Sequence, residues 1–116
     1  MLVDRLFVHT KVFDRLWEEL GCDDDDLAAL QTAICEDPQG CPVIRGTGGV
    51  RKIRVTLDGR GKSGGARVLY GDFPAHGLVY LFAAFAKNEK EDINSEERRF
   101  LKSAMTQIDR NWRDRK

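Results

Sequence analysis

Two hydrophobic periods alternate along the chain and divide it into helices and strands. Apolar residues recur at three- and four-residue spacing over 11–20, which predicts an amphipathic helix with Thr10 as its N-cap and Gly21 as its stop. The same spacing returns near the C-terminus, where Asn94 or Ser95 can cap a last helix. The apolar stripe of that helix consists of Leu101, Ala104, Met105, Ile108 and Trp112. Such a stripe either packs in the core or forms a docking face for a partner.

Four consecutive aspartates, Asp23–Asp26, precede a second helical segment that ends near Pro38 and Gly40. Carboxylates at the start of a helix accept hydrogen bonds from its free N–H groups and interact favourably with its dipole. A calcium loop would instead need acids spaced through a loop with a central glycine and a distal glutamate. We therefore interpret the run as a helix cap.

Strand patterns occupy the middle of the chain and its first residues. Over 50–57 apolar and polar residues alternate, regularly so from Lys52 to Leu57, which is typical of a strand with one buried face. The apolar face consists of Ile53, Val55 and Leu57, and the other face of Lys52, Arg54 and Thr56. A glycine-rich loop and a strand over 66–73 complete a hairpin. Residues 78–86 are almost all apolar, which predicts a central strand covered on both faces. Residues 2–8 predict a further short strand.

The order strand, helix, helix, strand, strand, strand, helix predicts a single α+β domain over 1–116 with a mainly antiparallel four-stranded sheet. A chain of this length can bury a sizeable core without disulfides. The first residues include Asp4 and Arg5 and no apolar run long enough for a signal peptide or a membrane span. We therefore expect a cytoplasmic protein.

Charge is segregated along the chain although its formal net value is zero. Residues 1–44 hold three basic and ten acidic residues, and residues 71–116 hold nine and eight. Residues 45–70 hold a single acid, Asp58, beside seven basic residues, which are Arg45, Arg51, Lys52, Arg54, Arg60, Lys62 and Arg67. Because local potential attracts a ligand, this stretch is compatible with an anionic partner such as a nucleic acid.

Three other signals favour ordinary structural roles. Cys22, Cys35 and Cys41 are odd in number, contain no CxxC pair and have only two histidines to complete a zinc site, so we expect no metal and no cofactor. The GKS of residues 61–63 resembles the end of a nucleotide-binding P-loop, but it lacks the upstream glycine and is followed by a strand where the motif needs a helix. The glycines of residues 46–49 could expose amides to a phosphate, but such clusters are usually turns.

Three blocks occur together in an order and spacing that resemble the RelE superfamily of bacterial toxins, closest to its HigB-like branch. They are GTGGVRKIRV, GRGKSGGARVLY and FAKNEKEDINSEE, and the similarity spans nearly the whole chain. The resemblance implies a RelE-like fold and a ribosome-dependent, metal-free mRNA endonuclease. In this chemistry a ribose 2′-OH attacks the adjacent phosphate. It also implies a cognate antitoxin, of the HigA-like helix-turn-helix type, and contact with DNA only through that antitoxin.

The resemblance assigns the catalytic roles to four basic residues. Lys52 and Arg54 match the family's basic pair, Arg67 its phosphate-holding arginine, and Lys87 the lysine after the fourth strand. Arginine is effectively always protonated, whereas a lysine surrounded by cations can supply a neutral amine, so Lys52 is the candidate base. Arg54 and Arg67 would hold the phosphate, and Lys87 would be the acid or a third clamp. The candidate contacts to RNA are Arg51, Arg60, Lys62, Asn88 and Lys90.

Two positions depart from the family pattern. Asn88 stands where RelE has a catalytic arginine, and the last helix contains no tyrosine, although Tyr70 or Trp112 could stack on a base. Two alternatives therefore stay open: a ParE-like gyrase poison, and a non-catalytic member that acts as corepressor with a DNA-binding antitoxin. For the antitoxin, the acidic first third and the apolar C-terminal stripe are both candidate docking surfaces.

Overall fold

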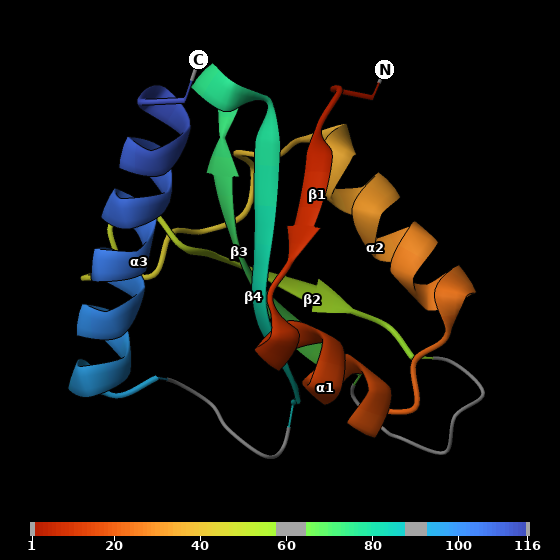
Figure 1. Ribbon diagram of the computed structural model, residues 1–116. Helices are drawn as coiled ribbons and strands as arrows, with labels where there is room; N and C mark the ends of the chain where they lie inside the picture. Colours follow the sequence, from red (N-terminus) through yellow and green to blue (C-terminus); the bar gives the residue numbers. More distant parts are fainter. Residues whose placement is uncertain (1, 58–64, 88–92, 116) are drawn as a thin grey trace.

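The computed structural model of the protein describes residues 2–57, 65–87 and 93–115. Within these residues a four-stranded sheet lies with α3 on one side and α1 and α2 toward the other (Figure 1). In chain order the elements are β1 (Leu6–His9), α1 (Lys11–Glu19), α2 (Asp24–Glu36), β2 (Arg51–Val55), β3 (Ala66–Phe73), the 3-10 helix η1 (Pro74–His76), β4 (Leu78–Ala86) and α3 (Ser95–Arg113). The α+β class and the order of elements predicted from the sequence are confirmed.

The strands are arranged in the order β1-β4-β3-β2. β2 with β3 and β3 with β4 are antiparallel, whereas β1 is parallel to β4. The mainly antiparallel sheet is therefore confirmed, but the first strand lies later than the predicted 2–8. Its pairing begins at Leu6 opposite Leu78, because Leu78 is the first residue of β4.

Each face of the sheet is covered by its own hydrophobic core. The core on the side of α1 and α2 joins Phe13, Trp17 and Ile34 to alternate residues of the strands. The core on the side of α3 joins Leu101 and Met105 to the intervening strand residues. β4 contributes to both cores, so the central, doubly covered strand expected for 78–86 is confirmed.

The predicted helix caps all form. Thr10 accepts a hydrogen bond from the Phe13 N–H, and Asn94 accepts one from the Glu97 N–H. Asp23 and Asp26 form a reciprocal capping box at the start of α2, as predicted for the aspartate run. The GKS of residues 61–63 lies outside the described residues, and the next described element is the strand β3, which begins at Ala66, where a P-loop requires a helix.

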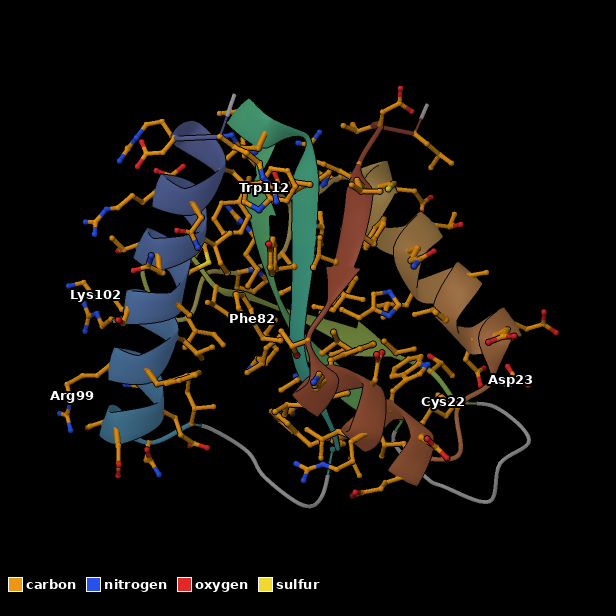
Figure 2. All side chains as sticks on the ribbon, viewed as in Figure 1. Cys22, Asp23, Phe82, Arg99, Lys102 and Trp112 are labelled. Atoms are coloured by element: carbon orange, nitrogen blue, oxygen red, sulfur yellow. The ribbon has the colours of Figure 1, made fainter. Side chains whose placement is uncertain are left out.

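The apolar stripe of α3 lies in the core. Leu101 and Met105 are buried, and Trp112 donates from Nε1 to the Tyr80 hydroxyl at 2.8 Å. Figure 2 shows Phe82 and Trp112 between α3 and the sheet, whereas Arg99 and Lys102 extend from the outer side of the helix. The stripe is therefore occupied by packing, and its alternative interpretation as a docking surface is not supported.

Tyr70 also has a structural role. Its side chain is fully buried, and its hydroxyl donates to the Pro38 carbonyl at 2.9 Å. Burial, followed by a hydrogen bond with Cys41, raises the pKa of Tyr70. Tyr70 therefore offers no open ring for base stacking, and the Arg115 guanidinium lies over the Trp112 ring, 4.5 Å from its centroid.

Arg5, the residue before β1, forms a two-point ion pair with Asp72 of β3, at 2.7 Å from Nε and 3.2 Å from Nη2. The pair joins the start of the chain to β3 and raises the pKa of Arg5.

None of the helices within residues 2–57, 65–87 and 93–115 combines the length and apolar composition that crossing a bilayer requires.

Gly65, the residue before β3, adopts a backbone conformation that other residues rarely adopt. Its φ is +71°, and a Cβ on it would overlap the Val55 carbonyl oxygen. We expect Gly65→Ala to lower the free energy of unfolding by at least about 2 kcal/mol, because left-handed strain and a backbone clash add. Gly77→Ala is the control, since Gly77 has φ +66° and no atom within 4 Å of its would-be Cβ. Urea denaturation that gave equal losses for the two variants would contradict this account.

Candidate functional site

The antiparallel register of β2 and β3 assembles the predicted catalytic residues. Arg54 lies directly opposite Arg67, and Lys52 lies two residues earlier on β2, opposite Leu69. Directly opposed residues on antiparallel strands point to the same face, with Cβ atoms about 5 Å apart. Lys52, Arg54 and Arg67 therefore share one face of the sheet.

That face is the one covered by α3. Leu69, the partner of Lys52, belongs to the core that contains Leu101 and Met105 of α3. Lys87 follows β4 directly, is exposed, and donates its N–H to the Gly65 carbonyl at 3.3 Å. It stands at the same end of the sheet as Arg54 and Arg67, because Ala66 pairs with both Val55 and Ala86. We call Lys52, Arg54, Arg67 and Lys87 the basic cluster.

Arg51 lies on the opposite face. It pairs with the buried Tyr70, and its Nη1 donates to the carbonyls of Gln39 and Cys41 at 2.8 and 2.6 Å. These bonds attach the start of β2 to the segment after α2. Among the candidate RNA contacts, Arg51 thus has a structural function that accounts for its position. Arg60, Lys62, Asn88 and Lys90 lie outside the described residues.

A groove of about 540 Å³ runs along β2 beside the basic cluster. We call it the β2 groove. It is lined by Cys41, Pro42, Val43, Ile44, Arg45, Lys52, Ile53, Arg54 and Arg98. Among the residues that the structure describes, every charged side chain in this lining is basic. A groove of this charge favours a polyanion over a neutral or cationic ligand.

The sequence interpretation did not assign Arg45 or Arg98 to the site. Both come from elements outside the two strands, and the turn over 44–50 brings them together. Thr47 closes this turn by accepting from the Val50 N–H at 3.0 Å and donating to the Ile44 carbonyl at 2.6 Å. Gly46, within the turn, lies under the stem of Arg98, whose Cδ is 3.6 Å from where a Cβ on Gly46 would stand.

The glycines of 46–49 have φ values of +83°, +73° and +115° at Gly46, Gly48 and Gly49. They are therefore turn residues whose conformation favours glycine, as the more common interpretation of such clusters predicts.

A second hollow is larger than the β2 groove. It measures about 630 Å³ and lies between α1 and α3, with Val12, Leu16, Phe85 and Phe100 in its mainly apolar wall. Apolar walls do not compensate the desolvation of a phosphate, so the smaller β2 groove is the better candidate for RNA backbone. Within the described residues, no three His, Cys, Asp or Glu side chains are grouped to hold a metal ion.

Comparison with known proteins identifies the family and agrees with the fold. The sequence model of the family described as the RelE toxin of the RelE / RelB toxin-antitoxin system matches residues 5–114. The chain belongs to the RelE toxin family. Among solved structures, that of a double mutant of the E. coli toxin RelE in the free state matches with a TM-score of 0.52 and 16% identity. The match covers 77% of this chain and 90% of that one. At this identity the RelE structure supports the fold alone.

In this RelE-family toxin, the positive charges of Arg54 and Arg67 lie directly opposite each other on adjacent strands and repel. Like charges directly across a strand pair destabilise a sheet by roughly 0.2–1 kcal/mol. We therefore expect Arg54→Thr to raise the free energy of unfolding by about 0.5 kcal/mol at low salt, and less at high salt because screening weakens the repulsion. Lys52→Thr is the control, since Lys52 faces Leu69 and should give no such gain. Thermal unfolding in which Arg54→Thr loses stability would contradict this interpretation.

Proposed function

We propose that this RelE-family toxin is a ribosome-dependent mRNA endonuclease that inhibits translation. The observation that supports the proposal is the register that sets Arg54 opposite Arg67, with Lys52 on the same face and Lys87 at the same end of the sheet. A concentration of fixed cations on one surface suits an RNA phosphate in a strained geometry. Family membership adds the expectation of a toxin paired with an antitoxin.

The proposed reaction needs no group beyond the basic cluster and the RNA. Lys52 accepts the proton of the ribose 2′-OH. The 2′-oxygen then forms a bond to the adjacent phosphorus while the bond from phosphorus to the 5′-oxygen breaks. Lys87 donates a proton to the departing 5′-oxygen; where Lys87 instead holds the phosphate, water supplies that proton. The products are a 2′,3′-cyclic phosphate and a 5′-hydroxyl.

Arg54 and Arg67 supply the electrostatic part. Their opposition places two planar guanidinium groups on one face of the sheet, where they can hold the non-bridging oxygens of one phosphate. Charge increases on these oxygens as the pentacovalent phosphate forms. The arginines therefore stabilise the transition state more than the bound substrate, and the bound phosphate relieves their mutual repulsion.

We further propose an antitoxin of the HigA-like helix-turn-helix type and place the toxin in the HigB-like branch, on the three sequence blocks that resemble it. Because the α3 stripe is buried, the acidic first third stays the candidate docking surface from the sequence. Its acids at Asp23–Asp26 start α2, on the face of the sheet opposite α3.

Substitution of the basic cluster tests the proposal. In single-turnover cleavage of mRNA on programmed ribosomes, we expect Lys52→Ala to lower the rate by about 10²–10⁴-fold through loss of the general base. Arg67→Ala should lower it by about 10²–10³-fold through loss of a charge donor. Arg99→Ala is the matched control, because Arg99 is exposed and extends from the outer side of α3 (Figure 2).

The outcomes also separate the alternatives. Unchanged cleavage by both cluster variants would overturn the assignment of these residues. A wild-type protein that arrests growth without cleaving mRNA, and that inhibits gyrase, would be a ParE-like poison. One that causes no growth defect without its antitoxin would be the non-catalytic corepressor. Thermal unfolding and antitoxin binding should remain unchanged in both variants.

A further inference from the structure

One wall of the β2 groove carries two arginines, Arg45 and Arg98, that have no role in the proposed reaction. Lys52 and Arg54 line the groove from the sheet, whereas Arg98 enters from α3, about one turn after the helix begins. Arg98 stands three residues before Leu101 and seven before Met105, so it lies on the face of α3 that packs on the sheet. A cation on the core-facing side of a helix is unusual, since charged residues are normally solvated.

The stem of Arg98 is held in place by packing. Its Cδ lies 3.6 Å and its Cβ 4.0 Å from the position of a Cβ on Gly46, and its side chain is half-buried. A side chain larger than hydrogen at Gly46 would therefore press on this stem. A long cationic side chain whose aliphatic part is immobilised loses less freedom when its charged end binds a ligand.

Arg45 completes the same wall. It is exposed in the turn over 44–50, adjacent to Gly46, and lines the β2 groove with Arg98. The groove thus has cations on both sides: Lys52 and Arg54 along the strand, and Arg45 and Arg98 along the turn and α3. The cations on one side of the groove are enough to bind a single phosphate. Two charged sides suit a chain of phosphates that continues past the basic cluster.

We propose that Arg98 binds a backbone phosphate of the messenger next to the scissile one and so positions the substrate in the β2 groove. This rests on the proposed nuclease function. Arg98 is a binding residue on this account, and it takes no part in proton transfer. Its loss should weaken substrate binding and leave the chemical step nearly unchanged.

The test compares Arg98→Gln with Arg99→Gln in cleavage of mRNA on programmed ribosomes. Glutamine keeps Cβ, Cγ and a carbon at the δ position beside Gly46, and it removes the guanidinium together with its charge. Arg99 is the neighbouring arginine, exposed and extending from the outer side of α3 (Figure 2). We expect Arg98→Gln to raise KM about tenfold with kcat changed less than about twofold, and Arg99→Gln to change neither. Arg98→Lys, which restores the charge, should recover most of the loss.

A second arm separates the messenger from ribosomal RNA as the source of the phosphate. Binding to ribosomes without mRNA should be equal for wild type and Arg98→Gln. The dependence of log(1/KM) on log salt should become shallower by about one phosphate contact in Arg98→Gln. Equal weakening on empty and programmed ribosomes would overturn the assignment to the messenger.

The remaining outcomes are also decisive. If the wild-type protein cleaves mRNA and the Arg98→Gln and Arg99→Gln variants have the same KM, the proposed role of Arg98 is wrong and the proposed nuclease function is unaffected. A fall in kcat with KM unchanged would also overturn that role, because that pattern belongs to a residue acting in the chemical step. Absence of cleavage by the wild-type protein would instead refute the proposed nuclease function.

Discussion

The pairing of β2 with β3 is the constraint on which the rest of the structure depends. Its register sets two arginines directly opposite one another on the face covered by α3, an arrangement that strand pairing alone disfavours. The cores on both sides of the sheet hold the strands in this register, with Val68 and Tyr70 packed on one face and Leu69 and Phe73 on the other. A slip of one residue would exchange the two sets and bury the cations.

This constraint explains how a chain of zero net charge can present a strongly basic surface. The acids of the first third are carried mainly by α1 and α2, and the core residues of those helices pack on the opposite face of the sheet from α3. The sheet therefore separates charges that the sequence places in different blocks. On the basic side, α3 and the turn over 44–50 continue the cationic surface beyond the strands.

Much of the fold could be predicted from local patterns. The strands at 66–73 and 78–86 and the caps at Thr10, Asp23 and Asn94 follow from alternation and from hydrogen-bonding side chains at helix starts. The start of β1 could not be predicted, because it depends on where a partner 72 residues later begins to pair, at Leu6 opposite Leu78. The assignment to the RelE family, made from three sequence blocks, is confirmed by the family match.

The positions of the candidate site residues relative to one another were predictable only on adjacent strands. Lys52 and Arg54 are two residues apart on one strand, so alternation alone puts them on one face. Arg98 joins them only because α3 packs beside the turn over 44–50, a contact between distant segments. One signal was present: Arg98 continues the i, i+3, i+7 stripe of Leu101 and Met105, where an apolar residue is the norm. Arg51 was predicted to contact RNA, because its spacing in the sequence gives no sign of its hydrogen bonds to the backbone carbonyls of Gln39 and Cys41.

The central claim is that fixed cations promote attack by a ribose hydroxyl on the messenger's own phosphate. Its most direct test uses ribosomes programmed with an mRNA whose scissile nucleotide carries either a 2′-hydroxyl or a 2′-hydrogen, with wild-type toxin in excess. The account predicts cleavage of the hydroxyl substrate alone, leaving a 2′,3′-cyclic phosphate and a 5′-hydroxyl. Cleavage of the deoxy-substituted message at a comparable rate would contradict it.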